Sequence, residues 1–544
     1  MNKFMSRIRE FENMCWAALL VAGAASFAAC SSDDAAVEKQ PETPATGKYT
    51  LTVKASKGDA GTRALTINDA VTPNELNAYW DGTETVTLTS GNESVQMTVA
   101  PDATDNTKAT LTATLTTAPA NGAELTMELC SASISGQEGT LAYIAEHCDY
   151  ATATTTATVS GTTITCSDAT FTNQNAIARF ALYHGSTLIS PTTLEVSISH
   201  SNQQVQAYLA SIGKDSYTFT IPAETYTTNG DGVLYFALPS LPASVTIQGV
   251  SVPLNAADFT LAFIATTAND VYAYIKTGYP FSAGKFYDIA VKMNPLVDLT
   301  TKDGDNYPDD GKYPAKDGDI LTGEWQYNSV TIPDRATVTL FNASINAHGS
   351  AGIECYGDAT IILEGSNTVT GSDGHPGIFV DESCTLTIKG SGSLRAEGRT
   401  YEFGGNKMCG AGIGGRPEGG NVIIEGGSIT AIGSYGSPGI GGSYDSNHLS
   451  PFAITFGNIT IKNTVTSVTA TKGEDAPYCI GPCKDGSCGI ITFGDEEVYA
   501  DWGWYDWFNY NIEKGVPIDD VGGLIVAPKD NGETWTLTPA PQAD

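Results

Sequence analysis

Basic residues are scarce in this chain. Its 28 Lys and Arg face 61 Asp and Glu, which gives a formal net charge of −33 over 544 residues. Binding to a phosphate backbone needs a stripe of positive charge that so few basic residues do not supply, so nucleic acid is excluded as an expected partner. The acidic residues are scattered, and the simplest consequence of their excess is solubility and mutual repulsion of exposed molecules.

Long hydrophobic runs are almost as rare. The run Cys15–Ala29 follows a basic stretch with Lys3, Arg7 and Arg9, and no other stretch is apolar enough to cross a bilayer. A short apolar run behind positive charges is typical of a signal peptide. We therefore expect a signal peptide over 1–29.

The end of this run, Phe27-Ala-Ala-Cys30, resembles a bacterial lipobox. The resemblance implies cleavage before Cys30 and lipidation of its thiol, with two or more acyl chains needed for stable anchoring in a membrane. The following Ser31-Ser-Asp-Asp34 resembles the signal that sends lipoproteins of some Gram-negative bacteria to the cell surface. The sequence thus predicts a lipid-anchored, surface-exposed protein of the outer membrane, whose anchor and polar linker cover 30–48.

Cysteines are too few for a disulfide framework. Without Cys15 and Cys30, nine of the 11 cysteines remain, which is an odd number. Cys479, Cys483 and Cys488 have no histidine near them in sequence, which argues against zinc. A local disulfide or a set of buried thiols is expected there instead.

Long amphipathic helical runs are also few, and the sequence shows alternating strands instead. Segments such as Tyr49-Thr-Leu-Thr-Val-Lys54 and Glu84-Thr-Val-Thr-Leu-Thr89 alternate apolar residues with Thr. This period of two is typical of half-buried antiparallel strands. Two successive sets of strands, over 49–172 and 173–296, predict two antiparallel β-sandwiches. The acidic stretch 297–318 misses the calcium-loop pattern and is expected to be a linker.

Three phrases resemble the fimbrillin family of pilin-like surface lipoproteins: Gly61-Thr-Arg-Ala-Leu65, Asn77-Ala-Tyr-Trp-Asp-Gly82 and Ala283-Gly-Lys-Phe-Tyr-Asp-Ile-Ala-Val291. The resemblance implies transthyretin-like β-sandwiches and a role in adhesion or pilus assembly. It also implies that Arg63 is a candidate protease cleavage site. Cleavage there would release the first strand, and the strand of another fimbrial subunit would take its place by strand exchange.

One phrase recurs five times between residues 336 and 482, and each copy is associated with a Gly-Ile-like anchor. The anchor isoleucines stand 25, 35, 27 and 40 residues apart, at Ile353, Ile378, Ile413, Ile440 and Ile480. Each unit can bury its apolar face only against its neighbours, so the repeats predict a parallel β-helix over 319–500. A meander of hairpins is the alternative, although Asn-Gly and Asp-Gly turns are scarce between the runs.

The Gly-Ile-Gly-Gly phrases within 411–415 and 438–442 resemble the β-helical carbohydrate-binding domain of many bacterial surface proteins. The resemblance implies glycan as the ligand class. Aromatic residues follow in 501–544, where aromatic planes beside carboxylates suit the faces and hydroxyl rims of sugars. The same side chains would alternatively form an aromatic cap and tail that closes the β-helix. The candidate glycan contacts are Trp502, Trp504, Tyr505, Asp506 and Trp507.

These patterns predict a lipid-anchored cell-surface adhesin that binds glycans and needs no metal or cofactor. A fimbrial subunit or a structural spacer without a ligand is one alternative. A polysaccharide-degrading enzyme is another, but the chain has no nucleophile elbow and no metal-spaced histidine pair, so we expect that it is not an enzyme. The enzyme alternative requires polar residues of several loops to converge, namely Asp373, His375, Arg416, Glu418, Asp445 and His448.

Overall fold

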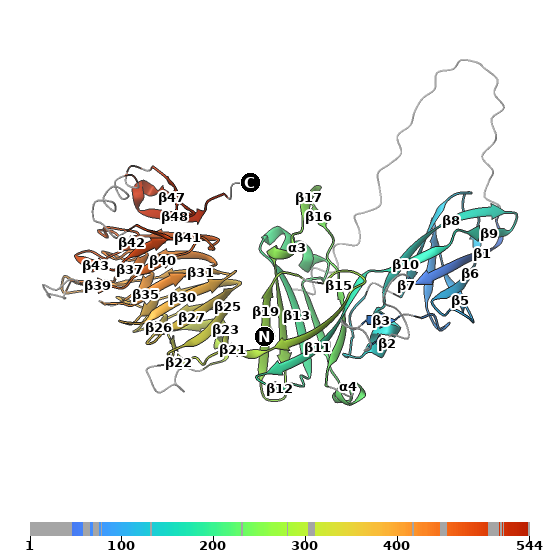
Figure 1. Ribbon diagram of the computed structural model, residues 1–544, viewed down its shortest axis with the longest axis horizontal. Helices are drawn as coiled ribbons and strands as arrows, with labels where there is room; N and C mark the ends of the chain where they lie inside the picture. The colour runs from blue at the N-terminus through green and yellow to red at the C-terminus, as the bar shows by residue number, and fades with distance from the viewer. Residues whose placement is uncertain are drawn as a thin grey trace, which may run out of the picture. The chain divides into compact units, whose positions relative to one another are not determined.

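The computed structural model describes residues 46–57, 66–68, 75–77, 79–130, 133–229, 232–279, 281–302, 311–415, 418–446, 454–498, 511, 514 and 516–541. Strands dominate these residues (Figure 1), which confirms the all-β prediction. The described helices are short, and α3 covers only Gln203–Ser211. None of the helices in these ranges combines the length and apolarity that a membrane span requires.

The first region is an eight-stranded set whose ladders are mostly antiparallel. The exception is β1 (Thr46–Lys57), which pairs in parallel with β9 and β10 and has β6 as its other neighbour. Its alternate residues Tyr49, Leu51 and Val53 are buried, as the period of two predicts. The other strands are β4 (Val86–Ser90), β5 (Glu93–Pro101), β6 (Lys108–Thr117), β7 (Glu124–Leu129), β8 (Ala151–Ser160), β9 (Thr163–Cys166) and β10 (Ala169–Asn173).

The second region has a core of its own, built by residues between Ala176 and Met293. One sheet places β11 (Asn175–His184) between β15 (Leu234–Pro239) and β20 (Phe286–Lys292). The other sheet is antiparallel and contains β13 (Thr193–His200), β14 (Ser216–Thr220), β18 (Phe259–Thr266) and β19 (Val271–Thr277). Phe180, Phe236 and Phe263 meet between the two sheets, with ring centroids 5.0 to 6.3 Å apart for the pairs that contact Phe180.

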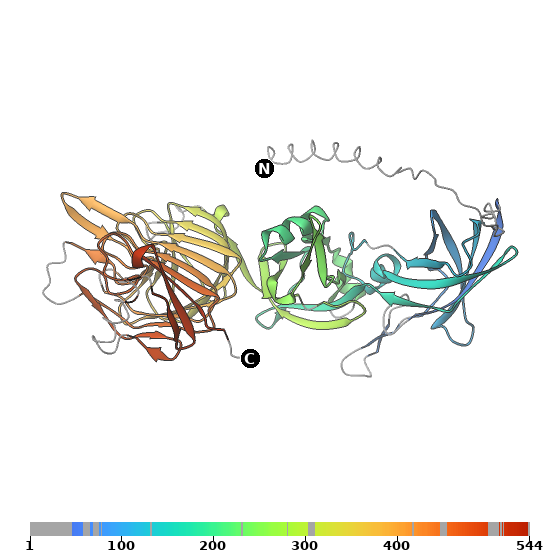
Figure 2. The same cartoon turned by 90° about the horizontal axis from the view of Figure 1, so that it is seen from above.

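The third region is a stack of parallel strands in three columns, called the parallel stack below (Figures 1 and 2). The first column is β23 (Ile320–Gln326), β25 (Ala336–Asn346), β27 (Ala359–Glu364), β30 (Thr385–Gly390), β35 (Asn421–Ile424), β40 (Ile459–Ile461) and β44 (Ile491–Phe493). The second continues the end of β25 through β28 (Ser366–Thr370), β31 (Ser393–Glu397), β36 (Ser428–Ile432) and β41 (Ser467–Thr471). The third is β22 (Lys312–Pro314), β24 (Ser329–Ile332), β26 (Ile353–Cys355), β29 (Ile378–Val380), β34 (Ile413–Gly414), β37 (Ile440–Gly441) and β42 (Ile480–Gly481).

The repeat anchors stack in register along the third column. Each of the five isoleucines lies opposite the next, from Ile353 to Ile480, and all five are fully buried. Glycine follows the last three anchors, and close packing requires it at Gly414, where a Cβ would collide with the carbonyl oxygen of Gly441. The anchor spacing of the sequence therefore marks one turn of chain per copy.

The stack begins earlier than the repeats suggest. Residues 297–318 were expected to be a linker, but β21 (Asn294–Asp298) pairs in parallel with β23. Val297, Leu299 and Tyr313 are buried in the core of the stack. The linker prediction is therefore wrong for the described part of this segment, because its few apolar residues complete the first coil.

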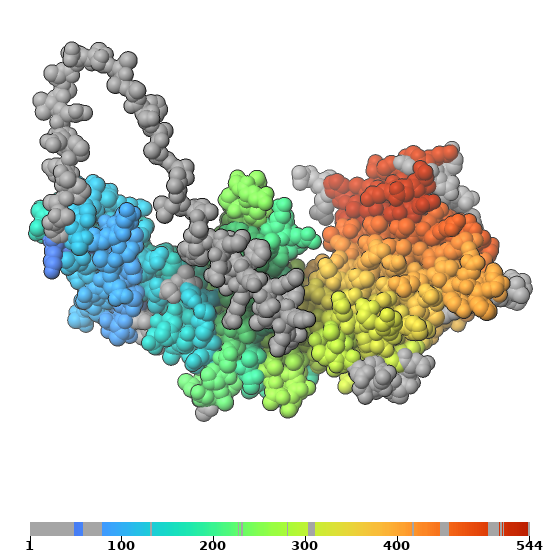
Figure 3. Space-filling view, turned by 180° about the vertical axis from the view of Figure 1, so that it is seen from behind, coloured from blue at the N-terminus to red at the C-terminus, as the bar shows by residue number. Residues whose placement is uncertain are grey.

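The far end of the stack is covered by a hairpin of β47 (Leu524–Lys529) and β48 (Thr534–Pro539). Strand β48 pairs antiparallel with β41 and brings Trp535 and Leu537 into the core. This pairing covers the last strand edge of the second column, which would otherwise expose unpaired backbone groups. In the space-filling view each coil covers the one before it as a continuous band (Figure 3).

Candidate functional site

The site residues predicted from sequence lie outside the described residues. They are Cys30, Arg63, Trp502, Trp504, Tyr505, Asp506 and Trp507. The described residues offer a different candidate on the parallel stack. It is a groove of about 400 Å³, called the loop groove below, and is lined among others by Tyr327, His348, Asp373, Arg399, Tyr401 and Met408.

The loop groove forms where the turns after β25, β28 and β31 lie beside one another. Backbone bonds hold these turns in register: the Ala347 amide donates to the Thr370 carbonyl at 3.0 Å, and the Gly374 amide donates to the Arg399 carbonyl at 3.1 Å. The groove therefore rests on the rigid coils beneath it, which is how a binding site gains precise geometry.

One wall of the groove is aromatic. Tyr327 is 72% exposed, and its ring packs edge-on against the His348 imidazole at 6.2 Å between centroids. Tyr327 also has a positive φ of 67°, a conformation that is uncommon for a residue with a large side chain. Its amide donates to the Asn346 carbonyl at 2.8 Å, which fixes this unusual backbone.

Another part of the groove lining comes from a hairpin formed by β32 (Thr400–Phe403) and β33 (Asn406–Cys409), which contributes Tyr401 and Met408. Tyr401 lies directly opposite Met408 in this ladder, and its ring is stacked with Phe403 at 6.5 Å. Phe403 is 73% exposed, which is unusual for a side chain of this size. The hairpin projects from the stack, as the orange strands at the edge of Figure 2 show.

The β32–β33 hairpin packs against Gly374. A Cβ at this position would lie 3.1 Å from the Cβ of Tyr401 and 3.2 Å from the Cβ of Met408. The φ of Gly374 is +79°, in the region that favours glycine. Glycine in this Asp-Gly-His turn therefore lets Tyr401 and Met408 pack closely against the turn.

The polar groups of the groove include several without partners. Within the described residues, the Asp373 carboxylate and the Arg399 guanidinium make no hydrogen bond or ion pair, and both residues are exposed. Asn346 donates through Nδ2 to Gln326 Oε1 at 3.0 Å. Its Oδ1 is buried and accepts no bond from the part of the chain that the structure describes. A buried acceptor without a donor is costly, so it favours a ligand that supplies one.

The structure describes four of the six residues of the enzyme alternative. Asp373 lines the loop groove, and His375 Nδ1 lies 3.0 Å from Ser372 Oγ in the same turn. Glu418 lines a separate hollow with Glu382 and Phe456. Asp445 lies in β38 (Tyr444–Asp445), opposite Met408 of the hairpin. Arg416 and His448 lie outside the described residues.

The cysteines near the end of the stack are thiols. Cys479, Cys483 and Cys488 form no disulfide, which leaves the buried-thiol alternative of the two that the sequence suggested. Burial raises the pKa of each thiol to about 12, so they are protonated near neutral pH. The described ranges contain no cluster of His, Cys, Asp and Glu arranged to hold a metal ion.

A larger hollow of about 680 Å³ lies beside strand β14 in the second region. Two of its three aromatic residues, Tyr217 and Phe219, pack into the core of that region. Burial raises the pKa of Tyr217 to about 12, which agrees with a shielded hydroxyl. The rings are therefore committed to the core, whereas those of the loop groove face solvent.

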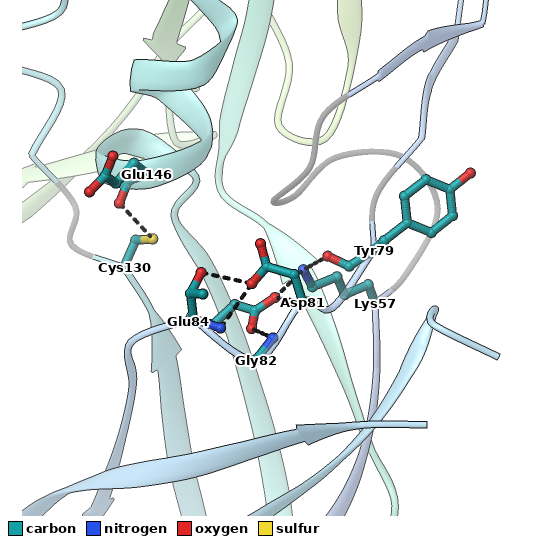
Figure 4. Close-up of polar contacts among 8 residues, drawn as sticks. Lys57, Tyr79, Asp81, Gly82, Glu84, Cys130 and Glu146 are labelled. Carbon is teal, nitrogen blue, oxygen red and sulfur yellow. Dashed lines mark hydrogen bonds and ion pairs between the residues drawn. The ribbon is translucent and has the colours of Figure 1, made fainter. Parts of the chain in front are cut away.

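A second polar cluster lies at the end of β1 (Figure 4). Lys57 Nζ lies 3.3 Å from Glu84 Oε1, and the two side chains are 2% and 0% exposed. Lys57 also donates to the Tyr79 carbonyl at 2.6 Å and lies 4.3 Å above the Trp80 ring. Glu84 accepts from the amides of Asp81 at 2.9 Å and Gly82 at 2.8 Å. Residues 79–82, from the phrase noted in the sequence, therefore supply backbone groups and a ring that surround a buried ion pair.

Comparison with known proteins gives distant likenesses. No family model matches the chain, and no curated protein matches it. A solved structure of a candidate cell adhesion protein from Bacteroides ovatus ATCC 8483 is 12% identical with a TM-score of 0.24, and the match covers 46% of this chain and 95% of that chain. A candidate cell adhesion protein from Bacteroides fragilis NCTC 9343 is 12% identical with a TM-score of 0.23, covering 44% and 92%. Likeness at this level is too distant to assign a fold or a function.

Proposed function

We propose that this chain is a cell-surface adhesin that binds glycans in the loop groove of its parallel stack. The observation that carries the proposal is the lining of this groove, which combines the exposed rings of Tyr327 and Tyr401 with the polar side chains of Asp373 and Asn346. Sugars present apolar C–H faces that pack on aromatic rings and hydroxyl groups that bind to carboxylates and amides. The groove offers both kinds of contact.

The free acceptors of the groove match the donors of a sugar. The Asp373 carboxylate has two oxygens that accept a pair of hydroxyl groups, and the buried Asn346 Oδ1 accepts one more. Hydrogen bonds from hydroxyls to a carboxylate are stronger than neutral ones, so Asp373 is expected to fix the orientation of the ring.

The finer architecture is part of the proposal. We take the parallel stack to be a parallel β-helix, which the three in-register columns support. The first two regions are taken as fimbrillin-like, transthyretin-like sandwiches that hold the β-helix away from the cell. Cys30 is proposed to anchor the chain by lipid in the outer membrane, with the stack facing outward.

The test is a glycan array probed with the purified full chain beside Tyr401→Ala. Tyr356→Ala is the matched control, since Tyr356 is 52% exposed but lies outside the groove. We expect binding that falls about 10-fold or more in Tyr401→Ala, as removal of a stacking ring does, and is unchanged in Tyr356→Ala. A variant with Trp502, Trp504 and Trp507 changed to Ala tests the aromatic segment as a second contact. A folded wild-type chain that binds no glycan would refute the proposal.

A fimbrial subunit is the second candidate function, and the position of β1 favours it. Strand β1 lies inside its sheet, between β6 on one side and β9 and β10 on the other. Its loss would leave two unpaired strand edges and the empty sites of Leu51 and Val53, which the strand of another subunit would fill. Mass spectrometry of the surface-isolated protein tests this: an N-terminus at Ala64 supports cleavage after Arg63, and an intact acylated Cys30 form alone removes it.

A further inference from the structure

We infer that the loop groove selects glycans that carry a carboxylate, such as uronic or sialic-type sugars, and that Arg399 is the residue that recognises the acid group. This inference rests on the proposed glycan-binding function. It is carried by an arginine that differs from the other arginines among the described residues of this strongly acidic chain.

Four arginines lie in the described residues, and three of them have a carboxylate partner. Arg179 lies 2.8 Å from Asp288, Arg335 lies 3.6 Å from Asp334, and Arg395 lies 2.7 Å from Glu397. The fourth, Arg399, has no such partner among the described residues. In a chain with 61 acidic residues, a guanidinium that no carboxylate of the described residues neutralises is available for an anion from outside.

The backbone around Arg399 is held by hydrogen bonds, while its side chain makes none to the residues that the structure describes. Its amide donates to the His375 carbonyl at 3.1 Å, and its carbonyl accepts from the amides of Gly374 at 3.1 Å and Gly410 at 3.0 Å. These three bonds join the residue to its two neighbouring turns. The backbone that carries the guanidinium is therefore already fixed, so less conformational entropy is lost when a ligand binds.

The chemistry of the groove favours a carboxylate flanked by hydroxyl groups. A guanidinium binds a planar carboxylate through two parallel N–H···O bonds, a geometry that lysine does not reproduce. Asp373 lines the same groove and repels a second anion, while it accepts hydroxyl groups. A sugar with one acid group and neighbouring hydroxyls satisfies both residues, and Tyr401 supplies a stacking face for its ring.

The experiment compares acidic glycans with their neutral counterparts. The probes are oligogalacturonate beside its carboxyl-reduced form, hyaluronan oligosaccharide beside its carboxyl-reduced form, and sialyllactose beside lactose. The full wild-type chain is measured with Arg399→Gln, with Arg399→Lys, and with Arg395→Gln as the matched control from the same coil. Circular dichroism and thermal unfolding confirm that each variant is folded.

We expect the wild-type chain to bind at least one acidic probe about 10-fold or more tightly than its neutral counterpart, in line with a charged hydrogen-bond pair. Arg399→Gln should remove this preference, Arg399→Lys should keep only part of it, and Arg395→Gln should leave it unchanged. Equal binding to acidic and neutral probes, or a preference that survives in Arg399→Gln, would overturn the assignment and leave the proposed function standing. If the folded wild-type chain binds no glycan at all, both the proposed function and the assignment of Arg399 are overturned.

Discussion

Two regions of this molecule bring cations and carboxylates together in opposite ways. At the end of β1, Lys57 and Glu84 are enclosed and satisfy each other, with further bonds to backbone groups. In the loop groove, Arg399 and Asp373 are exposed, and neither has a partner among the described residues. The buried pair of Lys57 and Glu84 holds the end of β1 in place, whereas the exposed Arg399 and Asp373 can bind a ligand.

The difference follows from the cost of moving a charge out of water. Burial lowers the pKa of the Lys57 ammonium, and the Glu84 carboxylate opposes that shift. A buried charge is tolerable only with its partner, because its hydration is lost. An exposed charge keeps its hydration and needs no partner. Unpaired charges are therefore found at the surface, where a ligand can reach them.

The largest expected effect is at the enclosed pair. Lys57→Met leaves Glu84 buried without a cation, so the free energy of unfolding should fall by about 3–5 kcal/mol. Urea unfolding of the full chain measures this loss. The double variant Lys57→Met with Glu84→Gln should recover much of it, since no charge is then left in the core. Equal stability of the single variant and the wild-type chain would show that the pair does not hold β1.

A smaller loss of stability is expected from substitution of Gly374, which packs against the β32–β33 hairpin. Gly374→Ala forces a Cβ against Tyr401 and Met408 and places alanine at a φ of +79°, so stability should fall by about 1–3 kcal/mol. Gly349→Ala is the control, because Gly349 has the same φ of +79° but no atom within 4 Å of the added Cβ. Thermal unfolding should therefore show a greater loss for Gly374→Ala than for Gly349→Ala. Equal losses would mean that the hairpin does not rest on Gly374.

Glu364 sharpens the comparison because it is a buried carboxylate without a cation among the described residues. Burial raises its pKa, while bonds from Ser391 at 3.0 Å and Thr277 at 3.5 Å oppose the shift. The folded state then holds the proton more tightly than the unfolded state, so stability falls as pH rises from the ordinary pKa of 4.5 through the raised value. Glu364→Gln should be more stable than wild type at neutral pH, by less than about 1 kcal/mol. Unfolding at pH 7 and below pH 4 checks this, since the gain should vanish in acid.

The smallest effect is expected for the open charges themselves. Arg399→Gln and Asp373→Asn each remove a charge without a partner, so the free energy of unfolding should change by no more than about 0.5 kcal/mol. Urea unfolding of both variants tests this beside their loss of ligand. A loss of several kcal/mol in either variant would place these residues with Lys57 as structural charges.

Much of the parallel stack could be predicted from the sequence. The isoleucine anchors lie opposite one another as their spacing indicates, because a repeating apolar face has nothing but its neighbours to pack against. The register departs from the alignment of the repeated phrases in places; Leu363, for example, lies opposite Gly390, two positions from the pairing that the repeated phrase suggests. A shift by two keeps each side chain on its own face, so the apolar pattern does not reveal it.

The loop groove could not be predicted in the same way. Its walls come from turns of different lengths, so the sequence alone does not show that Tyr327, Asp373 and Tyr401 are neighbours. Asp373 was singled out as part of an enzyme alternative, not as part of an aromatic groove. A signal was present in Tyr401-Glu-Phe403, where two large aromatics alternate in a short insertion after the third copy. Exposed aromatics in an insertion point to binding, because they have no core to fill.

The sequence by itself determined the all-β character of the chain and the stacking of its repeats. Both follow from the period of the apolar residues, which is a local property. Only the tertiary structure decided which turns lie side by side, and so which charges are paired. Lys57 meets Glu84 in the core, whereas Arg399 reaches a surface where no carboxylate of the described chain meets it. Pairing depends on distances in space between residues far apart in the chain, and the apolar pattern does not encode those distances.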